Sequence, residues 1–389
     1  MEEIKYVDRV GTDCNKWDSM DARFGDNDLM ALWVADMDFM VPECVRKAAR
    51  EYADFGIYGY YKVPDAYYQN FIDWEEKYHH CHIEKQWLRF SPGVVSPINW
   101  YVNMKTQPGD GIIVLTPVYY PFLDAIRDNG RQLISCDLVR KDKVYHIDYA
   151  DFEKKIVDNK VKLFILSSPH NPVGRVWKEE ELRRVADICA ANDVLLVCDE
   201  IHSDIVYTGH RHIPILALDE KYSQKCILLN APGKTFNVAG LKSSYSIIPS
   251  EELRKAFNAM QVAMSLDVKN TFGLEGTIAA YTDEGEEWME QELAYLEQNM
   301  AFASEFVEKN MPGAKLPKPE GTFLGWLDLR GLGLSDEELF RRIVLEAAVI
   351  FVPGGWFGPG GEGHIRLNAG CPRAMLQEAL ERIRDVLYK

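Results

Sequence analysis

Apolar residues in the middle of the chain follow two alternating patterns. Short runs of consecutive apolar residues, such as Val194–Cys198, are typical of strands that are buried on both faces of a sheet. The stretches between them, such as Lys178–Asn192, place apolar residues at helical spacing. The predicted strands are Ile112–Leu115, Gln132–Ser135, Val161–Leu166, Val194–Cys198, Ile227–Leu229 and Tyr245–Ile248, and the predicted helices are Val118–Asn129 and Lys178–Asn192. This alternation predicts a mainly parallel sheet with helices on both faces, which binds ligands beyond the carboxyl ends of its strands.

The pattern changes after about residue 285. A long polar helix over Glu286–Asn310 is followed by shorter elements, which together predict a smaller α+β unit. Its predicted strands are Gly321–Leu329, Val349–Val352 and His364–Asn368, and its predicted helices are Ser335–Glu346 and Pro372–Tyr388. The first forty or so residues show neither period, and we expect them to pack on this unit. We therefore expect an N-terminal segment (1–45), a large domain (46–285) and a small C-terminal domain (286–389).

Length, charge and cysteine usage restrict the class of protein. A chain of 389 residues exceeds the roughly 250–300 residues at which a single core stops growing, so two domains are expected. The formal net charge of −16 argues against nucleic acid or an anionic membrane surface as a main partner. No segment approaches the ~20 apolar residues that a membrane helix needs. Eight scattered cysteines without a C-x-x-C pair favour a reduced, cytoplasmic chain.

Two histidine-containing stretches, His79–His82 and His210–His212, raise the question of a metal site. Their spacing is not that of a closed zinc site, and no second pair of ligands lies nearby in the sequence. We interpret both stretches as solvated surface, and we expect no metal.

Lys234 and Asp199 are the first candidates for chemistry. Lys234 follows Gly233, and a helix is predicted to begin just beyond that glycine. A lysine in a restricted, partly desolvated place has a lowered pKa and can form a Schiff base, although a lone lysine in a polar turn is ordinarily a surface residue. Asp199 directly follows the buried strand Val194–Cys198. A carboxylate at that strand end can pair with a protonated pyridine nitrogen, or it can simply cap the next helix.

Two further strand or turn positions carry candidate binding groups. Asn171 lies between the strand Val161–Leu166 and Gly174, where its amide can donate to a phenolate oxygen or form an ordinary Asn-Pro turn. The turn at Gly93 precedes an apolar stretch. A glycine turn that opens a helix offers N–H groups and the positive end of the helix dipole to a phosphate, and an ordinary helix N-cap is the alternative.

Taken together, these segments resemble the fold-type I enzymes of the class I/II aminotransferase superfamily, which depend on pyridoxal 5'-phosphate (PLP). The resemblance covers essentially the whole chain and narrows to the cystathionine β-lyase (C–S lyase) branch, the MalY/PatB-like proteins. It rests on Leu32–Phe39, Tyr58–Tyr60, Thr116–Tyr119, Pro169–Trp177, Asp199–Asp204, Lys234–Leu241 and Ile365–Asn368. It implies an aspartate aminotransferase-like α/β fold, in which a large PLP-binding domain has a mainly parallel seven-stranded sheet flanked by helices and a smaller domain is α+β.

The resemblance also implies a cofactor role for single residues. Lys234 would carry PLP as a Schiff base and would act as the proton shuttle. The other implied contacts are Asp199 at the pyridine nitrogen, Asn171 and His202 at the phenolic oxygen, Tyr119 on the ring face, the backbone of Gly93, Val94 and Val95 at the phosphate, Lys242 as a further phosphate-binding cation, and Tyr60 from the neighbouring subunit of a homodimer. Many relatives carry a serine directly before the lysine or three residues before it. This chain has Gly233 and Ala231 there, so the sequence leaves open what replaces those phosphate contacts.

The implied substrate is an amino acid. Arg366 would bind its α-carboxylate in a bidentate fork, with Ala35 and Trp33 beside it. The implied reaction is α,β-elimination on cystathionine or a related cysteine S-conjugate, which yields a thiol such as homocysteine, pyruvate and ammonia. Transamination with a 2-oxo acid would use the same residues, so the motifs leave it open. A non-catalytic regulatory protein on the same scaffold is a third interpretation, against which the complete set of site residues counts.

Overall fold

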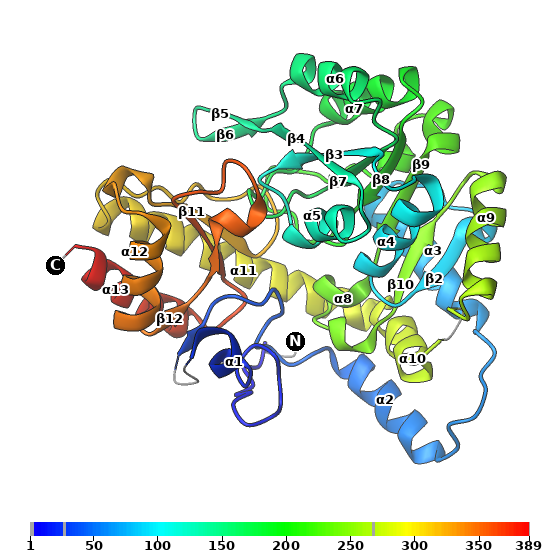
Figure 1. Cartoon of the computed structure of the whole chain (residues 1–389). Coiled ribbons are helices and arrows are strands. Elements are labelled where there is room, and N and C mark those ends of the chain that lie inside the picture. Colours follow the sequence, from blue (N-terminus) through cyan, green and yellow to red (C-terminus); the bar gives the residue numbers. More distant parts are fainter. Residues whose placement is uncertain (1–3, 26–28, 267–268, 389) are drawn as a thin grey trace.

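The largest sheet of the computed structural model, which describes residues 4–25, 29–266 and 269–388, has seven strands (Figure 1). Their order is β2-β10-β9-β8-β7-β3-β4, in which β10 is antiparallel to both of its neighbours and the remaining pairs are parallel. The strands are β2 (Leu88–Ser91), β3 (Gly111–Thr116), β4 (Gln132–Asp137), β7 (Leu163–Ser167), β8 (Leu195–Asp199), β9 (Cys226–Asn230) and β10 (Ser244–Ile247). The mainly parallel α/β sheet predicted from the sequence is confirmed.

Successive side chains of the central strands point into two different cores. On β3, Ile113 and Leu115 belong to one cluster of buried residues, whereas Ile112 and Val114 belong to another. This alternation explains the unbroken apolar runs in the sequence, because helices cover both faces of the sheet. The helices between residues 43 and 280 are α2 (Glu43–Phe55), α3 (Asp65–His79), α4 (Val95–Lys105), α5 (Tyr120–Arg127), α6 (Tyr149–Asp158), α7 (Glu179–Ala191), α8 (Pro232–Thr235), α9 (Glu251–Ala263) and α10 (Thr271–Ala280).

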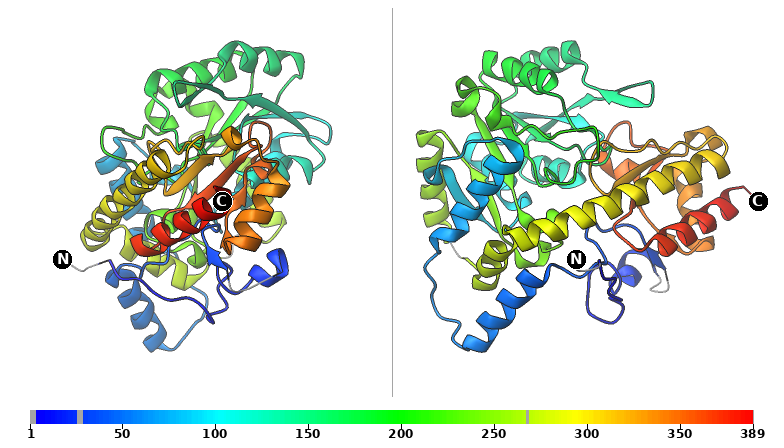
Figure 2. Two further views of the ribbon diagram at one scale, coloured as in Figure 1. Left: turned by 90° about the vertical axis from the view of Figure 1, so that its left-hand side faces the viewer. Right: turned by 180° about the vertical axis from the view of Figure 1, so that it is seen from behind.

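The remaining elements form a second, smaller layer of structure. Helix α11 (Asp283–Asn310) runs along the molecule from the large sheet to this smaller part, as both views from the side and from behind show (Figure 2). A three-stranded antiparallel sheet has the order β11-β14-β13. The elements here are β11 (Leu324–Asp328), α12 (Asp336–Phe340), β12 (Val349–Ile350), β13 (Val352–Pro353), β14 (His364–Asn368) and α13 (Arg373–Leu387). Among the described residues, no helix is both long and apolar enough to cross a membrane.

The N-terminal segment contains more regular structure than its pattern predicts. It has a short helix, α1 (Met20–Phe24), and a two-residue strand, β1 (Met30–Ala31), which pairs in parallel with β12. Both elements are too short to produce a recognisable period. The pairing places the N-terminal segment against the smaller part of the molecule.

Three elements of the smaller part differ from the prediction. The strand predicted at Val349–Val352 is two strands, because its first half pairs with β1 and its second half joins β14. The helix predicted at Ser335–Glu346 is α-helical only as far as Phe340 and continues as a π-helix over Arg341–Glu346. The strand predicted at Gly321–Leu329 begins only at Leu324, since Gly321 N donates to Gly174 O and Thr322 N donates to Ile205 O instead.

Two histidines predicted to be solvated are buried. His79 ends α3 and lies 2.8 Å from Asp204, and His212 lies 2.7 Å from Glu200. The interpretation of these residues as solvated surface was wrong, because each imidazole is paired with a buried carboxylate, 125 residues away for His79 and 12 residues away for His212. His80, His82 and His210 are exposed, as predicted.

Candidate active site

A pocket of about 240 Å³ lies beyond the carboxyl ends of β7, β8 and β9. This is the edge of a parallel sheet at which ligands bind. The predicted residues that line it are Ala35, Gly93, Val94, Val95, Tyr119, Asn171, Asp199, His202, Lys234 and Lys242. The residues that line it without having been predicted are Pro92, Ser96, Ser167, Ile201, Gly233, Ala239 and Ser243.

Lys234 lies on the single helical turn α8, directly after β9. The turn begins at Pro232 rather than beyond Gly233, which fits the preference of proline for the first position of a helix. The Nζ atom of Lys234 donates a hydrogen bond to the backbone oxygen of Ala35. Burial lowers the pKa of Lys234 to about 8, with Asp36 and Asp199 opposing the shift. Roughly a tenth of this amine is therefore uncharged at pH 7, which supplies the neutral form that a nucleophile or base requires.

Two asparagines hold the segment around Ala35 over the pocket. Asn237 donates from Nδ2 to the backbone oxygens of Met37 and Phe39, at 2.9 and 2.8 Å, and accepts from Met37 N at 3.0 Å. Asn368 donates from Nδ2 to the backbone oxygens on either side of Ala35. These bonds explain why the segments Leu32–Phe39, Lys234–Leu241 and Ile365–Asn368 belong to one site although they are far apart in sequence.

Asp199 and His202 form a second arm of the pocket. Asp199 ends β8, is buried, and accepts from the backbone N–H of Ile201 at 3.1 Å. Burial raises the pKa of Asp199 to about 7. Burial also lowers the pKa of His202 well below its ordinary value, with the charges of Lys234 and Arg366 acting in the same direction. The Nδ1 atom of this neutral His202 is buried without a hydrogen-bond partner among the described residues, so it is available to a ligand.

Arg366 and Asn171 are in direct contact. Arg366 lies on β14, is 2 % exposed, and donates to Asn171 Oδ1 at 3.1 Å and to the backbone oxygen of Trp33 at 3.0 Å. Because Oδ1 of Asn171 accepts from Arg366, its Nδ2 is the atom left to donate to a ligand. Burial lowers the pKa of Arg366 to about 10. Within the described residues no carboxylate pairs with this guanidinium, and its buried Nε atom has no hydrogen-bond partner.

Trp33 takes part through its backbone alone. Its indole is buried and donates from Nε1 to the backbone oxygen of Lys16 at 2.9 Å, and it does not line the pocket. The carbonyl group of Trp33 orients Arg366, and the position of Trp33 beside the substrate stays a prediction.

The turn at Gly93 differs in detail from the prediction. Gly93 has a φ of +95°, a left-handed conformation that favours glycine. Its N–H donates to Ser244 Oγ at 3.0 Å, so this amide is not available to a phosphate. The amides that open α4, at Val95 and Ser96, have no acceptor inside the helix. Ser96 and Ser243 also line the pocket, and the Ser243 hydroxyl shares a 3.0 Å hydrogen bond with the Tyr67 hydroxyl. The sequence signal for Ser243 was the pair Ser243-Ser244, directly after Lys242.

Tyr119 is part of the pocket lining, whereas Tyr60 is exposed and lies outside the pocket. Tyr119 precedes α5, lines the pocket, and has its pKa raised to about 12 by burial. Tyr60 lies in the chain between α2 and α3, which swings away from the body of the molecule (Figure 1). Its side chain is fully exposed, and the pocket of the same chain does not include it.

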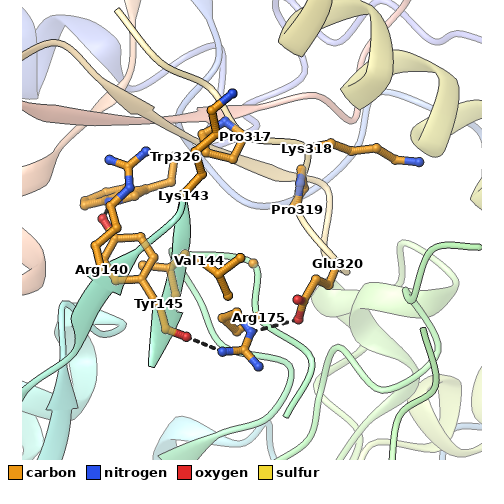
Figure 3. Close-up of a pocket in the computed structure, with 12 residues that line it drawn as sticks. Arg140, Lys143, Val144, Tyr145, Arg175, Pro317, Lys318, Pro319, Glu320 and Trp326 are labelled. Carbon is orange, nitrogen blue, oxygen red and sulfur yellow. Dashed lines mark hydrogen bonds and ion pairs between the residues drawn. The ribbon is translucent and has the colours of Figure 1, made fainter. Parts of the chain in front are cut away.

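A second pocket, of about 110 Å³, contains none of the predicted residues (Figure 3). The buried Arg175 projects into its floor and is fully paired, with Glu320 at 2.9 Å, Glu181 at 2.8 Å and the backbone oxygen of Tyr145. The adjacent Gly174 is required by packing, because a Cβ atom there would lie 2.3 Å from Pro319. The buried guanidinium of this pocket therefore already has its counter-ions within the chain. Among the described residues, no group of three or more His, Cys, Asp or Glu side chains is arranged to hold a metal ion.

Comparisons with known proteins agree with this arrangement. The family model for aminotransferase class I and II matches residues 27–383. The chain is 41% identical to the cystathionine beta-lyase PatB of Bacillus subtilis (strain 168), over 98% of this chain and 99% of that protein. Its structure is similar to cystalysin from Treponema denticola, which contains PLP, with a TM-score of 0.95, 34% identity and coverage of 99% and 98% of the two chains. It is also similar to the PLP-bound C-S lyase from Staphylococcus hominis, with a TM-score of 0.93, 34% identity and coverage of 100% and 98%.

Proposed function

The chain belongs to the aminotransferase class I and II family, in its cystathionine β-lyase branch, and we propose that it is a PLP-dependent carbon–sulfur lyase. It performs α,β-elimination on cystathionine or a related cysteine S-conjugate and releases a thiol, pyruvate and ammonia. The observation that carries this conclusion is the proximity of two groups at one site, because Arg366 is hydrogen-bonded to Asn171, which lines the pocket together with Lys234. Lys234 is an amine with a pKa of about 8, and Arg366 is a buried guanidinium without a carboxylate. An amino acid brings the carboxylate that Arg366 lacks and the α-proton that Lys234 removes.

The polar groups of the pocket residues match the functional groups of PLP in chemical type. When bound, PLP supplies an aldehyde that condenses with amines and a ring that accepts electrons from Cα. The free Nδ1 of His202 and the Nδ2 of Asn171 are polar groups suited to the phenolic oxygen, and Asp199 is an acid at the strand end suited to the ring nitrogen. The opening amides of α4, with Ser96, Ser243 and Lys242, are the donors suited to the phosphate.

Lys234 moves the proton. Its Nζ is neutral in part of the molecules near neutral pH, because burial disfavours the ammonium form. In this state Nζ accepts the α-proton of the substrate, and the resulting ammonium is stabilised by Asp36 and Asp199. The bond from Nζ to the backbone oxygen of Ala35 holds the amine at the side of the pocket that the N-terminal segment covers.

Arg366 orients the substrate. Its guanidinium already donates to Asn171 and to the backbone of Trp33, so its plane is fixed before substrate binds. Phe357 lies against it, with 5.1 Å between the guanidinium carbon and the ring centre. A carboxylate that approaches the remaining N–H groups gains charge-assisted hydrogen bonds without reorganising the arginine.

The product profile tests the proposed reaction. Purified protein with cystathionine and no keto acid is expected to release pyruvate, ammonia and thiol in equal amounts. Aminotransferases of the same family would use the same pocket residues, and they consume a 2-oxo acid as the second substrate. Turnover that occurs only when 2-oxoglutarate is added, with no free thiol, would replace the lyase with an aminotransferase.

We also propose that the active unit is a homodimer to which Tyr60 contributes across the interface. The support is an exposed apolar surface on and after α2, which a second copy would cover. Its exposed residues include Phe55, Ile57, Tyr58, Tyr60 and Tyr61. The division into 1–45, 46–285 and 286–389 is likewise proposed, and the separate seven-stranded and three-stranded sheets support it. The cytoplasmic location stays a prediction.

A further inference from the structure

Behind the candidate active site lies a buried polar cluster that the proposed reaction does not use. Its centre is Asp204, whose side chain is 4% exposed. Asp204 Oδ1 accepts from Trp74 Nε1 at 2.9 Å and pairs with His79 Nε2 at 2.8 Å. Asp204 Oδ2 accepts from Thr235 Oγ1 at 2.6 Å. One carboxylate therefore joins helix α3, its own loop and the turn α8.

The joined elements are those that carry the two arms of the pocket. Thr235 directly follows Lys234 on α8, and Asp204 ends the loop that begins with Asp199 and contains His202. Neighbouring residues on a helical turn point in different directions, so Thr235 faces the cluster while Lys234 faces the pocket. The bond between Thr235 and Asp204 thus ties the turn that carries Lys234 to the Asp199–His202 arm.

The hydrogen bond between Thr235 and Asp204 is an important side-chain contact of α8, because the backbone bonds of this turn stay within it. The turn has only four residues, and its backbone bonds run from Phe236 N to Pro232 O at 3.0 Å and from Val238 N to Gly233 O at 3.1 Å. These bonds shape the turn without connecting it to the other arm. A short helix is marginal by itself and takes its position from tertiary contacts.

Helix α3 supports both arms from behind. Besides Trp74 and His79 on Asp204, Glu75 accepts from Asn230 Nδ2 at 2.8 Å, and the same Nδ2 donates to Ser203 Oγ at 3.1 Å. Asn230 ends β9 just before α8, and Ser203 precedes Asp204. The charge of Asp204 is balanced by His79, so the cluster is a neutralised and hydrogen-bonded support rather than an isolated buried charge.

We propose that Asp204 is a positioning residue, which acts through Thr235 to fix Lys234 relative to Asp199 and His202. This inference rests on the proposed function, because it assigns Lys234 and Asp199 to the same bound group. Asp204 touches neither substrate nor cofactor in this role. Without the bond between Asp204 and Thr235, the Lys234 amine is still present, but it is free to shift. Even a small shift of a reacting group slows the reaction.

The decisive variant is Thr235→Val, which removes one hydroxyl and keeps the shape of the side chain. Thr235→Ser retains the hydroxyl and serves as the rescue. Thr277→Val is the matched control, since Thr277 is also buried and its Oγ1 also makes a single bond, to Gly273 O at 2.7 Å in α10. Asp204→Asn is a harsher variant, because it changes the charge that His79 faces, and it is used only if it folds.

Two readouts use the apoprotein and not the activity of the loaded enzyme. The first is the dissociation constant of PLP, measured by titration of the apoprotein. The second is the pH midpoint for labelling of Lys234 by an amine reagent, located by peptide mass spectrometry. For Thr235→Val we expect the dissociation constant to rise about 10-fold and the midpoint to rise by about one pH unit, toward the ordinary value for lysine. We expect kcat to fall about 10-fold while KM stays within about twofold.

The controls separate this role from plain stabilisation. Thr235→Ser is expected to stay within about twofold of the unmodified protein in every readout. Thr277→Val is expected to leave PLP affinity and the labelling midpoint unchanged, even if its melting temperature falls as far as that of Thr235→Val. The inference is overturned if Thr235→Val keeps the unmodified values, or if both valine variants change equally. If the unmodified apoprotein takes up no PLP, the proposed function fails first, and that outcome is distinguishable from the others.

Discussion

Two buried arginines of this molecule, Arg366 and Arg175, have opposite surroundings. Both side chains are almost completely removed from solvent, at 2% and 4% exposure. Arg175 is paired with Glu181 and Glu320 and also donates to a backbone oxygen. Arg366 donates only to neutral oxygens, and its Nε has no partner among the described residues. Arg175 lines the second pocket, Arg366 borders the candidate active site through Asn171, and of these two arginines only Arg366 lacks a counter-ion within the described residues.

The difference separates a structural charge from a binding charge. A buried ion costs several kcal/mol unless it is paired, so a protein that leaves one unpaired gives up stability at that position. The two carboxylates of the Arg175 cluster offset that cost inside the chain. Arg366 has no such compensation, and a substrate carboxylate provides it on binding. The unpaired arginine therefore identifies the pocket that binds an anion.

Replacement of the key lysine should give the largest contrast between the two pockets. For Lys234→Ala we expect kcat to fall by at least ~10³-fold, because the base for the α-proton is lost. Lys143→Ala, in the pocket of Arg175, is the matched control and should keep full activity. The measurement is pyruvate release from cystathionine. Substantial elimination by Lys234→Ala would require another base and would remove the central role of this lysine.

Replacement of Arg366 should affect binding more than stability. Arg366→Gln loses the charge-assisted bonds to the carboxylate, for which about 2–5 kcal/mol, equivalent to about 30- to 5,000-fold in kcat/KM, is typical. The melting temperature should not fall, because an uncompensated charge leaves the interior. Arg366→Lys should recover only part of the loss, since lysine cannot form the fork. A variant that binds substrate as well as the unmodified protein would refute the assignment.

Replacement of Arg175 should have the reverse effect. Arg175→Gln leaves Glu181 and Glu320 without their cation, and breaking a buried pair in this way costs about 3–5 kcal/mol. We expect a clear fall of the denaturant midpoint, whereas kcat/KM of the folded protein should stay within about threefold. Loss of activity without loss of stability would mean that Arg175 also serves the site.

The buried pair His79–Asp204 predicts that the stability of the protein depends on pH. This effect is smaller than those of the arginine substitutions. Burial alone would lower the pKa of His79, but Asp204, Glu75 and Glu200 raise it to about 9. An unfolded histidine loses its proton near pH 6.5, so between about pH 6.5 and 9 the folded state binds more protons. Stability is then fully present below pH 6.5 and falls as the pH rises to 9, by up to about 1.4 kcal/mol per pH unit. Glu75, whose pKa burial raises to about 8, acts in the same direction up to that pH.

The measurement is the denaturant midpoint from pH 6 to 9.5. His79→Gln keeps a neutral donor for Asp204 and should give a distinctly shallower slope over this range. An equal slope in both proteins would show that His79 does not carry the proton.

Much of the site could be predicted because its residues follow strand ends. Asn171 and Lys234 come shortly after β7 and β9, Asp199 ends β8, and a parallel sheet brings such ends to one edge. The unbroken apolar runs predicted the ends of those strands to within two residues. Arg366 was predicted from the motif resemblance alone, because it lies too far along the sequence from the other site residues for a local pattern to connect them.

The rest depended on contacts that sequence patterns do not encode. The amide of Gly93 is occupied by Ser244 across two antiparallel strands, and the bond that buries His79 joins it to a residue 125 positions away. The division of the predicted strand Val349–Val352 into β12 and β13 arises because one short segment serves two sheets. In each case the partner is chosen by tertiary packing, which overrides the local preference.

The most direct test of the unpaired arginine compares two substrates in two proteins. Cystathionine and its α-carboxamide at the reacting cysteine end differ only in the group that Arg366 is proposed to bind. The unmodified protein should prefer the carboxylate by about 10²-fold in kcat/KM, and Arg366→Gln should lose nearly all of that preference. A preference of the same size in both proteins would show that the substrate carboxylate is bound elsewhere and would contradict the account.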